Sequence, residues 1–314
     1  MRTKAIVAIC ALLAGSVASA MQFNDWSPSV SLESVAGTDP ALNTAFQDGC
    51  PAPSKDGLTL YMASNRPGGQ GGIDIWAAHR DSADDPFDAP VNLGPTINTA
   101  ADEFCPTPLI NGHALLFVST KAGGCGGSDI YIAREHPQKG WETPEHLSCL
   151  VNSAGDEASP FYVPEEGTGA LYFSSTRAGG FAADAPGAIT GDADIYASPV
   201  SAEGIVGAPS LVSGVNTSAN DFRPNVRRDA LEIFFDSNRG GGFGGLDIWS
   251  ATRESTTESW ALPVNLGPNV NSLGNETRPF LSWGATTLYF GTTRAGVEGS
   301  ADIFFTTRTK VTGQ

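Results

Sequence analysis

Glycines at the spacing of a nucleotide-binding loop stand in the segment SNRGGGFGGLDIW, residues 237–249. Gly240, Gly242 and Gly245 match the GxGxxG pattern that cradles the pyrophosphate of a dinucleotide. That chemistry needs a helix directly after the loop, because the N–H groups at the helix end bind the phosphate. The residues that follow the loop therefore decide whether this is a nucleotide site.

The glycine-rich segment occurs five times, and this repetition excludes a nucleotide site. The other copies are SNRPGGQGGIDIW (64–76), STKAGGCGGSDIY (119–131), STRAGGFAADAPGAITGDADIY (175–196) and TTRAGVEGSADIF (292–304). Only one copy of the five matches GxGxxG, and each continues into a strand-like Asp-Ile-aromatic sequence in place of a helix. We therefore interpret the segment as a turn, whose repeated Asp accepts hydrogen bonds from the loop N–H groups.

The rest of each unit repeats as well, which predicts the fold. Every unit has an Asn-Thr or Asn-Ser pair, then a carboxylate, then a proline three residues later and an apolar strand. About four short strands in some 55 residues are typical of a propeller blade. The last unit lacks its outer strand, and Trp26 to Asn43 at the start of the mature chain carries the missing pattern. We predict an all-β, five-bladed β-propeller of four-stranded blades over 21–314, a single domain closed by its N-terminal strand.

The repeated core, of the form DG-x-x-LYF-S-x-R-x-GG-x-DIY, resembles the WD-like propeller repeats of the TolB type. Such repeats occur in the periplasmic propeller of the Tol system and in many exported bacterial proteins. The resemblance covers nearly all of 22–314. It implies a propeller that serves as a scaffold, as a partner of envelope proteins or, in some cases, as an enzyme.

The repeated carboxylates are the first candidates for chemistry. They are Asp48, Glu103, Glu157, Asp221 and Glu276. A ring of carboxylates near the axis loosely resembles the five-bladed glycosidases, in which paired carboxylates act as acid and base. This implies a possible catalytic set of Glu103, Glu157, Asp221 and Glu276.

The repeat also favours a structural role for the same carboxylates. Each blade has a basic residue at the start of its glycine loop: Arg66, Lys121, Arg177, Arg239 and Arg294. In every blade the midpoint between carboxylate and base falls in or beside a predicted hairpin turn, so the two would be cross-strand neighbours. We favour five structural ion pairs over a catalytic set.

Candidate binding residues lie where the repeat varies. Two positions after the carboxylates stand Cys50, Cys105, Ser159, Arg223 and Arg278, and we expect them on the same strand face as the carboxylates. Arg223 and Arg278 could clamp a carboxylate or phosphate, or could neutralise the acidic ring, which we favour because buried carboxylates need pairing. Asp48 is a further binding candidate.

The third glycine loop carries an insertion that includes Asp184 and Asp192. These acidic residues are binding candidates, with calcium as one ligand to consider, although the spaced carboxylates of an EF-hand are absent. We expect no other metal and no cofactor.

The mature chain has four cysteines, Cys50, Cys105, Cys125 and Cys149, which allow three disulfide connectivities. Cys125 lies in a glycine loop and Cys149 ends the outer segment that follows it, so we predict that these two pair. Cys50 and Cys105 occupy equivalent places on neighbouring inner strands, and we predict a second disulfide between them. That bond requires their Cα atoms to lie within about 7 Å.

The N-terminus and the charge bound the location and the partners. Arg2 and Lys4, an apolar stretch and Ala18-Ser19-Ala20 form a signal peptide over 1–20, so we expect a periplasmic or secreted protein. No other segment is long and apolar enough for membrane insertion. The formal net charge is −16, which disfavours nucleic acid and anionic lipid as partners.

Neither a G-x-S-x-G motif nor a cluster of the four histidines supports catalysis. We therefore expect an exported, monomeric, non-enzymatic scaffold that binds an envelope protein or a glycan. The alternative is a glycosidase-like or lyase-like propeller enzyme that uses carboxylates at the axial channel.

Overall fold

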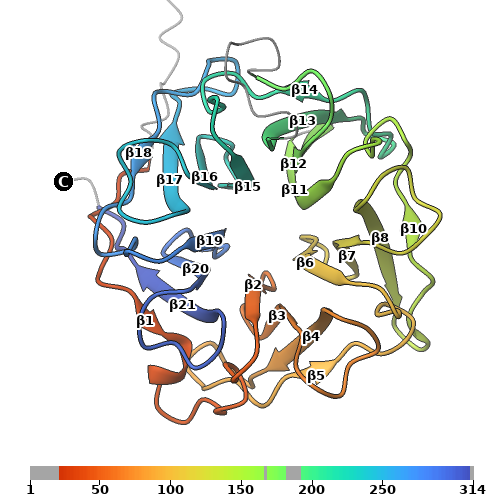
Figure 1. Cartoon of the computed structure of the whole chain (residues 1–314), viewed down its shortest axis with the longest axis vertical. Coiled ribbons are helices and arrows are strands. Elements are labelled where there is room, and N and C mark those ends of the chain that lie inside the picture. The colour runs from red at the N-terminus through yellow and green to blue at the C-terminus, as the bar shows by residue number, and fades with distance from the viewer. Residues whose placement is uncertain (1–20, 166–167, 182–191, 312–314) are drawn as a thin grey trace, which may run out of the picture.

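The computed structural model describes residues 21–165, 168–181 and 192–311, and it contains five antiparallel sheets arranged around one axis (Figure 1). This confirms the predicted five-bladed propeller. The predicted signal peptide, 1–20, lies outside the described residues. No helix among the described residues is long and apolar enough to span a membrane.

Each blade runs from an inner strand at the axis to a short outer strand. Blade 1 contains β2 (Asp48–Pro53), β3 (Thr59–Ser64), β4 (Asp74–His79) and β5 (Val91–Asn92). Blade 2 contains β6 (Glu103–Pro108), β7 (Ala114–Ser119), β8 (Asp129–His136) and β10 (Glu145–His146), and β9 (Gly140–Trp141) pairs with the far end of β8. Blade 3 contains β11 (Glu157–Glu165), β12 (Thr168–Ser175), β13 (Asp194–Val200) and β14 (Ser210–Leu211).

The last two blades follow the same order. Blade 4 contains β15 (Asp221–Val226), β16 (Glu232–Ser237), β17 (Asp247–Thr252) and β18 (Val264–Asn265). Blade 5 contains β19 (Glu276–Leu281), β20 (Thr287–Thr292) and β21 (Asp302–Thr307), and its outer strand is β1 (Val30–Ser31), near the start of the described residues.

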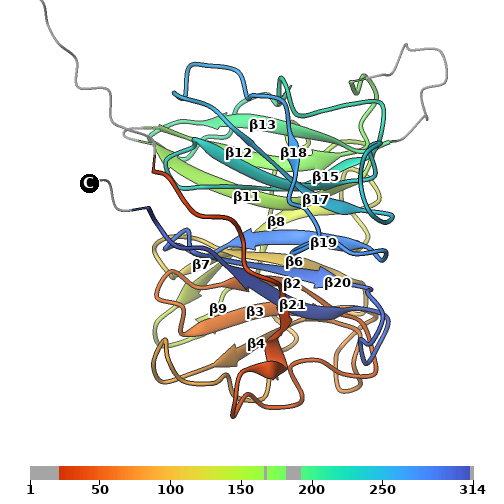
Figure 2. The ribbon, with the colours of Figure 1, turned by 90° about the vertical axis from the view of Figure 1, so that its left-hand side faces the viewer.

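The N-terminal strand closes the ring as predicted. Val30 lies opposite Phe305 and Ser31 opposite Phe304, so β1 covers the edge that β21 would otherwise leave unpaired. Figure 2 shows the N-terminal segment descending along the side of the propeller to β1. The extra residues between Trp26 and Asn43 form the 3-10 helix η1 (Leu32–Ser34) and the turns that follow it.

Apolar side chains fill the space between neighbouring blades, because each sheet is buried on both faces. Ile75 of blade 1 packs with Phe117 of blade 2, and Phe234 of blade 4 packs with Phe290 of blade 5. All four side chains are fully buried. This packing between blades fixes the radial position of every inner strand, and so it positions the residues at the axis.

Candidate functional site

The five repeated carboxylates are fully buried and hold the chain in place at the start of each inner strand. Asp48 is typical. Its Oδ2 accepts hydrogen bonds from the Thr44 N–H at 2.6 Å and from the Thr44 hydroxyl at 2.7 Å, while its Oδ1 lies 2.5 Å from Arg66 Nη2. Each carboxylate thus joins the connection from one blade to the first strand of the next, because Thr44 belongs to that connection.

The predicted ion pairs form in four blades. They are Asp48–Arg66, Glu157–Arg177, Asp221–Arg239 and Glu276–Arg294. The residue directly opposite Asp48 is Ser64 rather than Arg66, so the predicted cross-strand register differs from the observed one by two residues. The arginine reaches back from the following turn, and its Nε donates to the Ser64 hydroxyl at 2.9 Å.

Blade 2 departs from this pattern. Glu103 accepts a 2.5 Å hydrogen bond from the Ser119 hydroxyl, and no salt bridge joins it to Lys121 within 4.0 Å among the described residues. The Lys121 Nζ instead lies 3.9 Å from the ring centroid of Tyr131, a cation–π contact. Burial lowers the pKa of Lys121, and the nearby charge of Glu103 opposes this shift.

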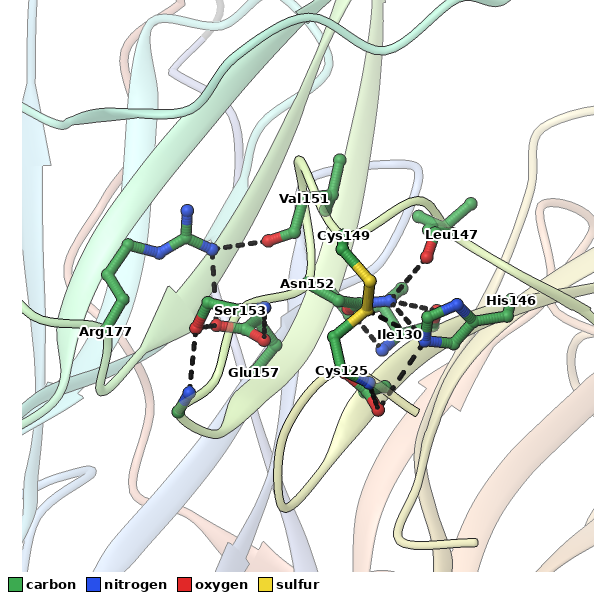
Figure 3. Close-up of a disulfide and its surroundings, with 12 residues drawn as sticks. Cys125, Ile130, His146, Leu147, Cys149, Val151, Asn152, Ser153, Glu157 and Arg177 are labelled. Carbon is green, nitrogen blue, oxygen red and sulfur yellow. Dashed lines mark hydrogen bonds and ion pairs between the residues drawn. A yellow bond between two sulfur atoms is a disulfide. The ribbon is translucent and has the colours of Figure 1, made fainter. Parts of the chain in front are cut away.

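These contacts leave the proposed catalytic set without access to a substrate. Glu103, Glu157, Asp221 and Glu276 are 0 % exposed, and both oxygens of Glu157 accept hydrogen bonds from Ser153. Figure 3 shows Glu157 enclosed by Ser153 and Arg177. A carboxylate that acts on a glycosidic bond must reach the sugar, so the geometry assigns these residues to the scaffold.

The repeated Asp of each glycine loop also has the structural role that we predicted. In blade 4, Asp247 accepts hydrogen bonds from the Phe243 N–H at 2.5 Å and from the Asn265 side chain at 2.9 Å. In blade 3, Asp194 accepts from the Phe181 N–H, and Leu211 occupies the position that Asn265 holds in blade 4. Burial, only partly offset by the Phe181 hydrogen bond, raises the pKa of Asp194 to about 6.

Asp192 lies close to Asp194, and burial raises its pKa too. Asp184, the other acidic residue of the insertion, lies outside the described residues.

A bulge turns the varied residues toward the axis. In every inner strand the pairing register shifts between the first and the fourth residue after the carboxylate, for example between Gly49 and Ala52. At each bulge one residue adopts a positive φ between 49° and 59°: Cys50, Cys105, Ser159, Arg223 and Arg278. Our expectation that these side chains share a face with the carboxylates was therefore wrong, because a bulge re-aims the side chain that it carries.

The axial cavity that these residues line is small, at about 30 Å³, and no carboxylate is among its described lining residues. Arg223 Nη1 lies 2.5 Å from Asp236 Oδ2, and the Arg278 N–H donates to Asp236 Oδ1 at 2.9 Å. The arginines therefore contact Asp236, and the idea that they neutralise the repeated carboxylates was wrong. Sequence analysis missed Asp236. A signal was present, because the equivalent positions in the other four blades are uncharged: Ala63, Val118, Ser174 and Gly291.

The cysteines form one disulfide and one thiol pair. Cys125 and Cys149 are bonded, with their Cα atoms 5.7 Å apart, which confirms the first predicted bridge (Figure 3). His146 Nε2 lies beside this disulfide, 3.5 Å from Asp129 Oδ2. Cys125, Asp129 and His146 have metal-ligand types, but the disulfide removes the Cys125 thiolate that a metal would need. Cys50 and Cys105 are thiols whose Sγ atoms lie 2.7 Å apart, so the second predicted bridge stays a prediction.

A much larger groove, of about 840 Å³, lies between the N-terminal arm (residues 21–29) and the outer part of blade 4. The arm is held by Asn269, whose side chain donates to the Trp26 carbonyl at 2.8 Å, and by Arg308, which stacks 3.7 Å from the Phe23 ring centroid. Sequence analysis missed this groove, because its residues come from the arm and from loops rather than from a repeated position.

Four carboxylates line the groove: Asp25, Glu232, Glu254 and Glu258. Glu232 is buried and accepts hydrogen bonds from Arg308 at 2.7 Å to each of its oxygens, and from Arg227 at 2.6 Å. Asp25 on the arm and Glu254 and Glu258 after β17 are exposed. The groove thus presents carboxylates from two separate segments of the chain.

Comparison with known proteins identifies similar folds but no family. No family model matches the chain, and no curated protein does. An α-L-arabinofuranosidase from Lactobacillus brevis matches at 10 % identity and a TM-score of 0.55, over 91 % of this chain and 95 % of that one. An endo-arabinanase of the GH43 class from Bacillus licheniformis matches at 13 % identity and a TM-score of 0.53, over 88 % and 97 %. A proposed TolB from Agrobacterium tumefaciens gives 12 % identity and a TM-score of 0.48, over 93 % and 100 %.

At such identities the likeness establishes the five-bladed propeller fold. The matches include several glycoside hydrolases of the GH43 and GH62 classes, among them an arabinofuranosidase from Podospora anserina. These matches contradict our expectation of a non-enzymatic scaffold and favour the glycosidase-like alternative. The matches do not support the axial position that we predicted for the catalytic carboxylates, because no carboxylate of the described residues lines the axial cavity.

Proposed function

We propose that this protein is an exported glycoside hydrolase that binds a glycan in the groove between the N-terminal arm and blade 4. The observation that carries the proposal is the set of exposed carboxylates, Asp25, Glu254 and Glu258, around one large groove. The fold, which the chain shares with arabinan-degrading enzymes, supports the same class of activity.

The dimensions and lining of the groove suit a sugar chain. Its volume of about 840 Å³ lies within the range of small-molecule sites. Its lining mixes apolar surface from Phe23 and Leu266 with polar residues such as Asn24 and Ser259. Sugars present both apolar ring faces and hydroxyl groups, so a mixed lining of this kind can contact them on both sides.

The carboxylates divide into a fixed one and three free to react. Glu232 is committed to Arg227 and Arg308, so it links blade 4 to the segment that follows β21 in blade 5. Glycoside hydrolysis needs one carboxylic acid to protonate the leaving oxygen and one carboxylate to act as base or nucleophile. Asp25 faces the groove from the arm, whereas Glu254 and Glu258 face it from the loop after β17, so an acid and a base can come from different sides.

Arabinofuranosides are the substrates to try first, because the similar folds include arabinofuranosidases and an arabinanase. The experiment measures turnover of arabinan, arabinoxylan and chromogenic α-L-arabinofuranosides, beside a panel of other glycosides. We expect turnover of at least one substrate by the mature chain. The acid and the base are among the three exposed carboxylates, so the variants to compare are Asp25→Asn, Glu254→Gln and Glu258→Gln. We expect kcat/KM to fall by about 10²- to 10⁴-fold in each variant that removes the acid or the base.

The matched control is Glu142→Gln, an exposed carboxylate on blade 2 that does not line the groove. It should leave both kcat/KM and the melting temperature unchanged. The proposal fails if the protein turns over no glycoside in the panel, or if all three groove variants retain the kcat/KM of the original protein.

A further inference from the structure

The axial cavity brings two thiols together. Cys50 on the inner strand of blade 1 and Cys105 on that of blade 2 have their Sγ atoms 2.7 Å apart. Both residues sit at the bulge with a φ of 49°, so the backbone aims both side chains at the axis. They are 4 % and 5 % exposed, respectively. The pair belongs to a different part of the molecule from the groove.

Two arginines share this cavity, but only one carboxylate accompanies them. Arg223 pairs with Asp236, whereas no carboxylate of the described residues lies within ion-pair distance of the Arg278 side chain. Arg278 is partly buried, and a positive charge that is withdrawn from water is costly unless a negative charge compensates it. The cysteines are the groups that raise the pKa of Arg278 most strongly, ahead of Asp236 and against the effect of burial. A thiolate at this site would supply the negative charge that the Arg278 side chain lacks.

The two thiols differ in how readily they ionise. Burial alone would raise the pKa of Cys105, but the hydrogen bond with Cys50 and the charge of Arg278 outweigh it and lower that pKa to about 6. Ser159 and Arg223 act in the same direction. Burial raises the pKa of Cys50 well above its ordinary value. The ionisable groups that act on Cys105 are thus Cys50, Arg278 and Arg223, and Cys105 is the thiol of the pair that ionises more readily.

We propose that Cys105 and Cys50 form a peroxide-reactive dithiol that closes into a disulfide between blades 1 and 2. The Cys105 thiolate attacks one oxygen of hydrogen peroxide, which breaks the O–O bond, gives a sulfenic acid and releases hydroxide. The Cys50 sulfur then attacks the Cys105 sulfur, and the sulfenic oxygen leaves as water with the Cys50 proton. Two thiol sulfurs are oxidised and one peroxide is reduced.

The size of the cavity selects the oxidant. A cavity volume of about 30 Å³ is roughly twice what one water molecule needs, so a molecule as small as hydrogen peroxide fits into it. A disulfide such as oxidised glutathione is many times larger and cannot reach the buried thiolate. The site is therefore expected to respond to small peroxides and to resist thiol–disulfide exchange.

The test follows Cys50 and Cys105 as free thiols in the folded chain with its Cys125–Cys149 disulfide intact, by peptide mapping after the chain has been unfolded and alkylated. Hydrogen peroxide in slight excess should produce a Cys50–Cys105 disulfide, and oxidised glutathione should produce neither that bond nor a mixed disulfide. The Cys125–Cys149 disulfide should remain unchanged and serves as the internal reference. In the Cys50→Ser variant, Cys105 should stop at a sulfenic acid, which dimedone traps when the chain is unfolded in its presence after the peroxide has been removed.

The role of the arginine gives the quantitative readout. Arg278→Met should slow oxidation about thirty-fold at pH 7, because a thiol of ordinary pKa is only a few per cent ionised there. Arg134→Met, a surface variant on blade 2, should leave the rate unchanged. The thiolate absorbance at 240 nm in the unmodified chain, measured against Cys105→Ser, gives the midpoint without depending on the folding of the arginine variant.

A midpoint near pH 6 and a fast reaction with peroxide support the proposal. A midpoint above pH 8, a reaction no faster than that of free cysteine, or faster oxidation by glutathione disulfide than by peroxide overturns it.

Discussion

Two rings of side chains stand two residues apart on the same five inner strands, and they differ in residue type and in what they contact. The first consists of the repeated carboxylates, all fully buried and hydrogen-bonded to the chain. The second consists of two cysteines, one serine and two arginines around the axial cavity. The comparison teaches that a position repeated in each blade serves the scaffold, whereas a position that varies can acquire its own chemistry.

The groove extends this contrast, because it lies outside the repeat altogether. Its residues come from the N-terminal arm and from loops of blade 4. The arm is therefore both the last strand of the ring and one wall of the groove.

The largest effect should follow removal of residues 21–44. This deletion takes away β1, which pairs with β21, and the aromatic residues Phe23 and Trp26, which stack on Arg308. An unpaired edge strand favours aggregation, so we expect an insoluble protein or one that melts at least about 10 °C lower. Calorimetry and light scattering measure both. If the chain starting at Ala45 is monomeric and has the same melting temperature as the chain starting at Met21, the arm has no role in closing the ring.

An intermediate effect on the free energy of unfolding should follow removal of the basic residue beside the repeated carboxylate, and it should be larger in blade 3 than in blade 2. Arg177→Met leaves Glu157 buried without its ionic partner and should cost about 3 kcal/mol of unfolding free energy. Lys121→Met removes mainly a cation–π contact with Tyr131 and should cost about 1 kcal/mol or less. Denaturant unfolding of the two variants measures the difference. Equal losses would mean that Lys121 supports Glu103 as strongly as the arginines support their carboxylates.

The smallest effect should appear as a pH dependence at Asp194. The pKa of this group is raised from an ordinary value of 3.8 to about 6, so its contribution to stability is present below pH 3.8 and is lost as the pH rises through 6. The melting temperature of Asp194→Asn minus that of the original protein should therefore increase as the pH rises from 4.5 to 7.5. Asp247→Asn is the matched control, because its carboxylate accepts two loop N–H groups and one side-chain amide. The control should lose stability at pH 7.5. A difference between Asp194→Asn and the original protein that does not change with pH would contradict the assignment.

Much of the fold could be predicted because its residues repeat at a fixed spacing. The glycine loops and the carboxylates recur once in each unit, so their positions could be predicted from the repeat length. The same repeat showed that the last unit lacks its outer strand and that the N-terminal segment carries it. The Cys125–Cys149 bond also followed, because both residues lie near one loop of the same blade.

The axis and the groove could not be predicted in the same way. A one-residue bulge turns Cys105 and Arg278 toward the axis, and strand alternation alone places them on the wrong face. Asp236 meets Arg223 only through this bulge. The groove depends on how the arm packs against blade 4, which no local pattern specifies. The likeness to glycoside hydrolases likewise emerges from the arrangement of the blades rather than from any motif.

The most direct test of the central claim compares Glu157→Gln with the groove variant that loses turnover, on the substrate that the glycoside panel identifies. Our account assigns Glu157 to the scaffold and catalysis to the groove. Glu157→Gln should lower the melting temperature by on the order of 10 °C and leave kcat/KM of the folded protein within a few-fold of the original. The groove variant should lose about 10² or more in kcat/KM at an unchanged melting temperature. Loss of turnover in Glu157→Gln, with its melting temperature unchanged, would contradict the account and return catalysis to the repeated carboxylates.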